Sequence, residues 1–147
     1  MLALLLAATV ASPAPLPTPQ TLPAVSVQAP LATLRLQVAR TAEQRERGLM
    51  YVRRLPAHAG MVFVFDDDET VSFWMKDTLV PLDMIFVAAD GRVRTVYPNV
   101  APAASLPDDQ IPIETATAKY VVELAGGDAA RDGIVPGARL AGITSLR

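Results

Sequence analysis

The chain has 147 residues, of which 51% are hydrophobic and 19% charged, and its formal net charge is -2. This length and composition predict one globular domain, and the small negative charge argues against a nucleic-acid partner. The chain has no Cys, so disulfides, thiolate catalysis and Cys-based zinc sites are excluded.

The first twelve residues have the form of a signal peptide. An apolar run within MLALLLAATV is followed by small residues, with Ala11 in the last position before a cleavage site. No Lys or Arg precedes this run, and the run is shorter than the roughly 20 residues of a membrane span. We therefore expect residues 1–12 to be a signal peptide or a membrane-tethering leader, with no transmembrane span beyond it. The protein is accordingly expected to be periplasmic or secreted.

A proline-rich stretch follows this leader. Its prolines fix φ and favour extended conformations, which predicts a semi-rigid linker over residues 13–30. The prolines are Pro13, Pro15, Pro17, Pro19, Pro23 and Pro30. The folded domain is then expected over residues 32–145.

The domain begins with one strand and one short helix. In residues 32–40 apolar and polar side chains alternate, which is typical of a half-buried strand. Thr41 is placed to cap a helix, Gln44 completes a capping box, and Gly48 can end the helix after about two turns.

Short runs rich in Val, Phe, Ile and Tyr predict the remaining strands. The runs are GMVFVF (60–65), VSFWMK (71–76), MIFVA (84–88), RVRTVYP (92–98) and KYVVEL (119–124). Asp90-Gly91 predicts a tight hairpin between the third and fourth of them. Residues 125–140 predict a second short helix and a last strand. The expected fold is mostly β (α+β), a compact antiparallel barrel-like or curled sheet with two short helices.

Several of these segments resemble, in order and spacing, the bacterial and archaeal DUF192 (domain of unknown function 192) family. They read RGLMYVRRLPAHAGMVFVF, FWMKDTLVPLD, GRV, YVVELAGG and GIVPGARL. The resemblance implies a compact β-rich domain, often exported, with no established activity. The family usually has Asn where this chain has Asp77, and a carboxylate cannot donate a hydrogen bond as an amide can.

The densest group of polar residues lies in FWMKDTLVPLDMIFV, residues 73–87. If residues 71–76 form a strand, Trp74 and Lys76 share one of its faces, and Pro81 then turns the chain. Polar groups at a strand end can converge on a ligand. The candidate ligand-binding residues are Trp74, Lys76, Asp77, Thr78 and Asp83, with Arg47 placed to reach the same cleft.

A structural role explains the same residues equally well. Lys76 and Asp83 could form a partly buried ion pair that braces the fold without binding anything. The other polar groups favour simpler interpretations: the arginines near Arg53 are expected on a solvated face, and the acids in FDDDET in a charged turn. His58 is the only histidine, so it cannot form a multi-histidine metal site.

Three functions remain open from the sequence. The first is an exported, non-catalytic domain that binds a small polar or cell-envelope ligand beside Trp74, Lys76 and Asp83. The second is a hydrolase or lyase acting on an envelope carbohydrate, in which Asp77 and Asp83 divide acid and base roles. The third is a domain that recruits a protein partner through a sheet edge or an apolar rim. No cofactor or metal is expected, and the oligomeric state is not predicted.

Overall fold

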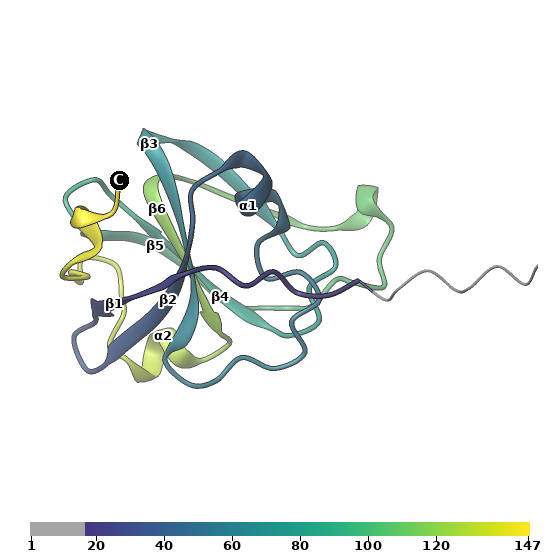
Figure 1. Ribbon diagram of the computed structural model, residues 1–147, viewed down its shortest axis with the longest axis horizontal. Coiled ribbons are helices and arrows are strands. Elements are labelled where there is room, and N and C mark those ends of the chain that lie inside the picture. The colour runs from purple at the N-terminus through teal and green to yellow at the C-terminus, as the bar shows by residue number, and fades with distance from the viewer. Residues whose placement is uncertain (1–16) are drawn as a thin grey trace, which may run out of the picture.

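The computed structural model describes residues 17–147, so the predicted leader and the start of the linker lie outside the described residues (Figure 1). One six-stranded sheet has the order β1-β2-β3-β6-β4-β5. Its strands are β1 (Ala24–Gln28), β2 (Thr33–Ala39), β3 (Ala59–Trp74), β4 (Leu82–Val87), β5 (Val93–Val100) and β6 (Ile113–Ala125). The helices are α1 (Ala42–Arg47) and α2 (Asp128–Arg131), with 3-10 turns η1 (Asp108–Gln110) and η2 (Ile143–Ser145).

The predicted fold class is confirmed. Only β2 and β3 run parallel, and all other neighbouring strands pair antiparallel. Among the described residues no pairing joins β1 to β5, so the sheet is curled but not closed. Within residues 17–147, no helix is both long enough and apolar enough to cross a membrane.

Two local predictions are confirmed by hydrogen bonds. The Thr41 hydroxyl accepts from the backbone N–H of Gln44, and the Gln44 side chain accepts from the backbone N–H of Thr41, as a capping box requires. At the predicted hairpin, Gly91 has φ 84° and donates its N–H to the carbonyl of Ala88. A glycine suits this positive φ because it has no Cβ.

Three predicted boundaries are wrong. Residues 60–65 and 71–74 are not separate strands but parts of the 16-residue β3, because a register shift between Val64 and Glu69 lets the chain continue along β6, and the expected strand ends at Trp74 instead of Lys76. The expected linker contains β1, which pairs with β2 and buries Val27 to 1% exposure. The expected last strand is absent from residues 125–140, where only an isolated bridge joins Arg92 to Arg139.

The central strands are buried on both faces, and alternate residues enter two clusters. The valine cluster contains Val62, Ile85, Val122 and Leu124, and residues of the C-terminal segment cover it. The aromatic cluster contains Met61, Phe63, Met84, Phe86 and Val121, and it is covered by Leu49 after α1 and by Ala103 and Ile111 around η1. Figure 1 shows these coverings on opposite sides of the molecule, with the C-terminal segment on the left and α1 and η1 on the right.

We predict that a chain starting at residue 32 is less stable than one starting at residue 17. The shorter chain loses β1, and burial of a side chain such as Val27 alone contributes about 1.5–3 kcal/mol. Urea unfolding of both chains measures the difference, with Val27→Ala in the longer chain as a milder control. Equal midpoints for the two chains would show that β1 is dispensable.

Candidate ligand-binding site

A cavity of about 200 Å³ lies between α1, the end of β3 and β6. We call it the Glu123 cavity, after the acid of β6 that lines it. Its lining includes four aromatic side chains, three cations and two hydroxyls. The aromatic residues are Phe63, Phe65, Phe73 and Trp74, and the polar ones are Arg45, Glu46, Arg47, Ser72, Lys76, Thr78 and Glu123.

Glu123 occupies a position where the sheet otherwise carries apolar side chains. It lies opposite Met61 of β3 on one side and Met84 of β4 on the other, two members of the aromatic cluster. At Gly60 a Cβ would collide with the carbonyl oxygen of Glu123, so glycine permits the close approach of β3 to β6 here. The backbone of Glu123 is thus held between β3 and β4 in the middle of the sheet.

The carboxyl group of Glu123 is buried yet unpaired. Its residue is 4% exposed, and no side chain or backbone group among residues 17–147 makes a hydrogen bond to the carboxyl. Within the described residues, no buried side-chain oxygen or nitrogen is both sealed off and without a partner. The carboxyl oxygens of Glu123 therefore open onto the cavity, where they can accept or donate a hydrogen bond.

Burial raises the pKa of Glu123 from 4.5 to about 8. Removal from water disfavours the charged form, and burial is the only cause of the shift. The side chain is therefore mostly a neutral carboxylic acid at pH 7. No neighbouring charge contributes to this shift.

Each of the three cations that line the cavity lies over an aromatic ring at its rim. The guanidinium carbon of Arg45 is 4.9 Å from the centroid of Phe65, and that of Arg47 is 5.8 Å from the centroid of Tyr51. The ammonium of Lys76 is 5.2 Å from the centroid of Trp74. Such cation–π contacts hold the charges in place without neutralising them.

The structure brings four of the six predicted site residues together. Arg47, Trp74, Lys76 and Thr78 all line the Glu123 cavity. Trp74 is 38% exposed, and Lys76 lies over its ring from the turn that follows β3, so the two are neighbours although the strand ends before Lys76. Thr78 is buried and donates its hydroxyl to the carbonyl of Lys76 at 3.1 Å, which fixes the turn that follows β3.

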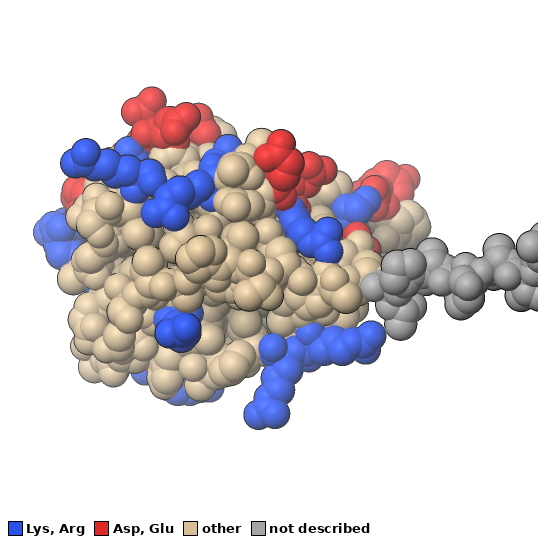
Figure 2. Space-filling view, viewed as in Figure 1, with Lys and Arg blue, Asp and Glu red and all other residues tan. Residues whose placement is uncertain are grey.

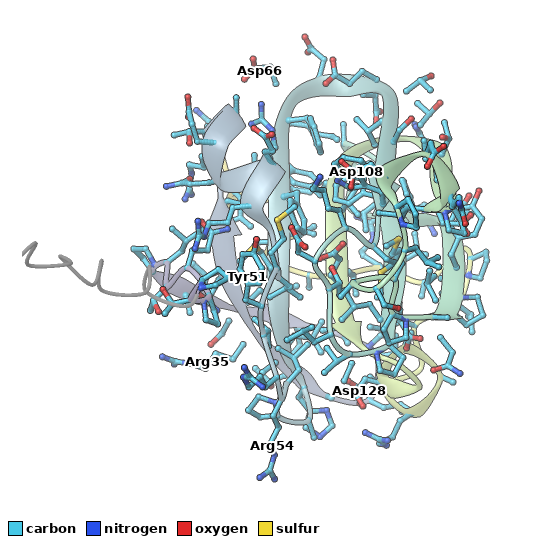
Figure 3. The ribbon with its side chains drawn as sticks, turned by 90° about the vertical axis from the view of Figure 1, so that its right-hand side faces the viewer. Arg35, Tyr51, Arg54, Asp66, Asp108 and Asp128 are labelled. Carbon is cyan, nitrogen blue, oxygen red and sulfur yellow. The ribbon has the colours of Figure 1, made fainter. Side chains whose placement is uncertain are left out.

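Asp77 does not line the cavity but supports one of its edges. Its carboxylate accepts a hydrogen bond from the hydroxyl of Tyr51 at 3.0 Å, and its carbonyl accepts from the backbone N–H of Tyr51 at 2.9 Å. The first of these bonds raises the pKa of Tyr51. Both bonds require only an acceptor at residue 77, so the carboxylate serves here as well as an amide. In Figure 3 Tyr51 lies below α1, whereas Arg54 projects away at the far end.

Asp83 lies elsewhere, and its predicted place in the site is wrong. It is 0% exposed, and its carboxylate accepts from the backbone N–H groups of Asn99 (2.7 Å), Gly127 (3.0 Å) and Ala129 (2.8 Å). These bonds tie β4 to the end of β5 and to the start of α2. A carboxylate satisfied in this way is a structural brace.

The expected ion pair between Lys76 and Asp83 is also wrong. Lys76 pairs with Asp108 of η1, and this hydrogen bond raises the pKa of Lys76. Asp108 comes from a surface loop, so the pair is partly exposed rather than a buried brace.

The sequence analysis missed Glu123, although a signal for it exists. KYVVELA places one acid among apolar residues in the interior of a predicted strand. Glu is rarely fully buried without a partner, so an acid in such a position marks either a salt bridge or a functional site.

A second hollow lies along β2 and the segment after α1, and it is lined by Arg35, Arg53, Arg54 and His58. Arg53 and Arg54 are exposed, as the sequence indicates. On the face drawn in Figure 2, the lower half shows Lys and Arg without Asp or Glu beside them. The Nδ1 atom of His58 is 2.9 Å from the Oδ2 atom of the buried Asp132. This contact holds the loop in place, so His58 serves the fold rather than a metal.

Comparison with known proteins gives one family and two solved structures. The family model of DUF192, described as uncharacterised ACR, matches residues 24–142. A protein from Sinorhizobium meliloti, provisionally named a transcription regulator, is 35% identical with a TM-score of 0.73, covering 82% of this chain and 95% of its own. A protein of unknown function from Novosphingobium aromaticivorans is 32% identical with a TM-score of 0.71, covering 86% and 93%. No match was found among curated proteins.

Replacing Asp83 should destabilise the fold much more than replacing Asp108. Asp83→Ala leaves buried backbone N–H groups without an acceptor, with a loss on the order of 3 kcal/mol in the free energy of unfolding. Asp108→Ala is the matched control, because it removes only an exposed pair and should change stability little. Chemical denaturation compares the variants, and similar midpoints for both would contradict the assignment of Asp83 as a brace.

The stability of the protein should depend on pH through Glu123. Between pH 4.5 and about 8 the folded chain keeps a proton on Glu123 that the unfolded chain has released. The free energy of unfolding therefore falls as pH rises through this window, by an amount on the order of a few kcal/mol. Glu123→Gln has no proton to lose at this position, so the stability of the variant relative to the wild type should rise from pH 5 to pH 9. A constant difference, measured by urea unfolding at each pH, would show that the pKa is not raised.

Proposed function

Because this chain belongs to the DUF192 family, whose description assigns no activity, we propose a function from the cavity itself: an exported, non-catalytic domain that binds a small polar organic ligand. Export rests on the form of residues 1–12 alone. The ligand occupies the Glu123 cavity, beside Trp74 and Lys76, and its source is the cell envelope or its surroundings.

The unpaired carboxyl of Glu123 carries this proposal. No protein group among residues 17–147 bonds to this carboxyl, and its oxygens open onto the cavity, so it is available to a ligand there. Structural acids in this chain look different. Asp83 is saturated by backbone N–H groups, and Asp128 and Asp132 are paired with Arg131 and His58.

The size and walls of the cavity fit a small ligand. Its volume of about 200 Å³ is below the roughly 300–1,000 Å³ of pockets for drug-sized molecules. Four aromatic side chains supply apolar contact, while Glu123 and the rim cations supply a few fixed polar groups. This combination of apolar walls and few polar groups is typical of binding sites for single metabolites.

The enzyme hypothesis is less well supported. It assigns the acid and base roles to Asp77 and Asp83, and neither of these residues lines the Glu123 cavity. A nucleic-acid role, suggested only by the provisional name of the Sinorhizobium meliloti protein, is not favoured by a net charge of -2.

Ligand binding should change the fluorescence of Trp74, the only tryptophan, because this residue lines the cavity and is partly exposed. We would titrate the protein with amino acids, betaines, monosaccharides, sugar acids and small carboxylic acids. At least one class should shift the emission of Trp74, and the response should be lost in Phe73→Ala. Leu106→Ala, an exposed apolar residue outside the cavity, is the control. No response to any class, together with no rise in the thermal midpoint, would contradict the proposal.

A further inference from the structure

We infer that the ligand of the Glu123 cavity is a small zwitterion of the amino-acid type, with its ammonium group at Glu123 and its carboxylate at the rim beside Arg45 and Arg47. This inference rests on the proposed function and names the class of its ligand. It depends on a difference between the two ends of the cavity: the floor suits a cation and the rim suits an anion.

The floor of the cavity suits a cation. Phe63 and Phe73 line the same cavity as Glu123, and aromatic rings attract positive charge at their faces. The ring of Phe65, in contrast, is already covered by Arg45. An ammonium group donates hydrogen bonds, which the free oxygens of Glu123 can accept. A ligand carboxylate or phosphate at the same place could only accept the single proton of the neutral acid, and it would keep Glu123 from ionising.

The rim suits an anion. Among residues 17–147, neither Arg45 nor Arg47 makes a salt bridge, although each is fixed by hydrogen bonds to backbone carbonyls. Lys76 adds a third positive charge, already shared with Asp108, and Glu46 is the one acid of the rim. The net charge there is positive, so the carboxylate end of a ligand is drawn outward while its ammonium end enters.

The other groups around Glu123 do not change this picture. β3 and β4 place Met61 and Met84 beside it, and the charged groups that line its cavity are Arg45, Glu46, Arg47 and Lys76. An ammonium within about 4–6 Å of a carboxyl stabilises the ionised form. Binding of a zwitterion at pH 7 should therefore release the proton that burial keeps on Glu123.

A matched series of probes tests the inference by isothermal titration calorimetry. The series is leucine in both enantiomers, 2-hydroxy-4-methylpentanoate, in which a hydroxyl replaces the ammonium, and 4-methylpentanoate, which has neither. Alanine, glycine betaine, glucose and glucuronate extend the series to smaller, methylated and sugar ligands. Each titration is run at pH 7 in phosphate and in Tris, because buffers of different ionisation enthalpy report the protons released.

We expect an amino acid to bind at least tenfold more tightly than the carboxylates without nitrogen, and to release about one proton per ligand. Glycine betaine, whose quaternary nitrogen has no N–H to donate to Glu123, should bind more weakly than the amino acids. Glu123→Gln should lose at least tenfold in affinity for the zwitterion and release no proton, whereas Glu69→Gln, an exposed acid outside the cavity, should behave as the wild type. Arg47→Gln should weaken the binding of zwitterions and of simple carboxylates alike.

Other results would overturn the inference. If the hydroxy acid or a sugar binds as tightly as every zwitterion, or if zwitterions bind without proton release, the assignment of an ammonium group to Glu123 is wrong while the proposed function stands. If no probe binds and none changes the emission of Trp74, the zwitterion and the proposed function both fail. A folded Glu123→Gln that binds the zwitterion with unchanged affinity would also contradict the role of Glu123.

Discussion

The carboxyl group of Glu123 is confined to an apolar face because β6 is paired along both of its edges. Met61 and Met84 flank it in register, and Gly60 brings β3 against its backbone. A shift of one residue in β6 would exchange the two faces of the strand and disrupt both clusters. The sheet therefore fixes this carboxyl where no protein donor among residues 17–147 bonds to it and where its oxygens face the cavity. The rest of the site follows from this constraint, since α1 and the turn after β3 complete the cavity above it.

The charged residues between Phe73 and Val87 have two different roles. Some lie at the rim of the Glu123 cavity, and others stabilise the fold. Lys76 belongs to the rim with Trp74, and Asp77 anchors Tyr51 behind it. Asp83 belongs to the support, since its buried carboxylate accepts backbone N–H groups from two distant segments. An apolar segment can therefore carry several charges without conflict, because each is either paired, capped by backbone or open to a cavity.

Local features of the sequence predict local features of the structure. The Thr41 capping box, the hairpin at Gly91 and the position of Lys76 beside Trp74 each depend on neighbours in the chain, and each is found as expected. Asp83 was misplaced because its partners lie 16 to 46 residues away, and nothing near it indicates them. Glu123 was not predicted as a site residue because its burial depends on the pairing of β6 with β3 and β4. The predicted linker was too long because Val27 becomes a core residue only once β1 pairs with β2.

The most direct test of this account is the pKa of Glu123 itself, measured by NMR from the chemical shift of its carboxyl carbon as pH is varied. The assignment can be made by comparison with Glu123→Gln. We predict a pKa of about 8 in the free protein, since burial without a partner disfavours the carboxylate. We also predict that a bound zwitterion lowers this pKa. A free-protein pKa near the ordinary value of 4.5 would show that Glu123 is solvated or paired, and it would contradict the central claim.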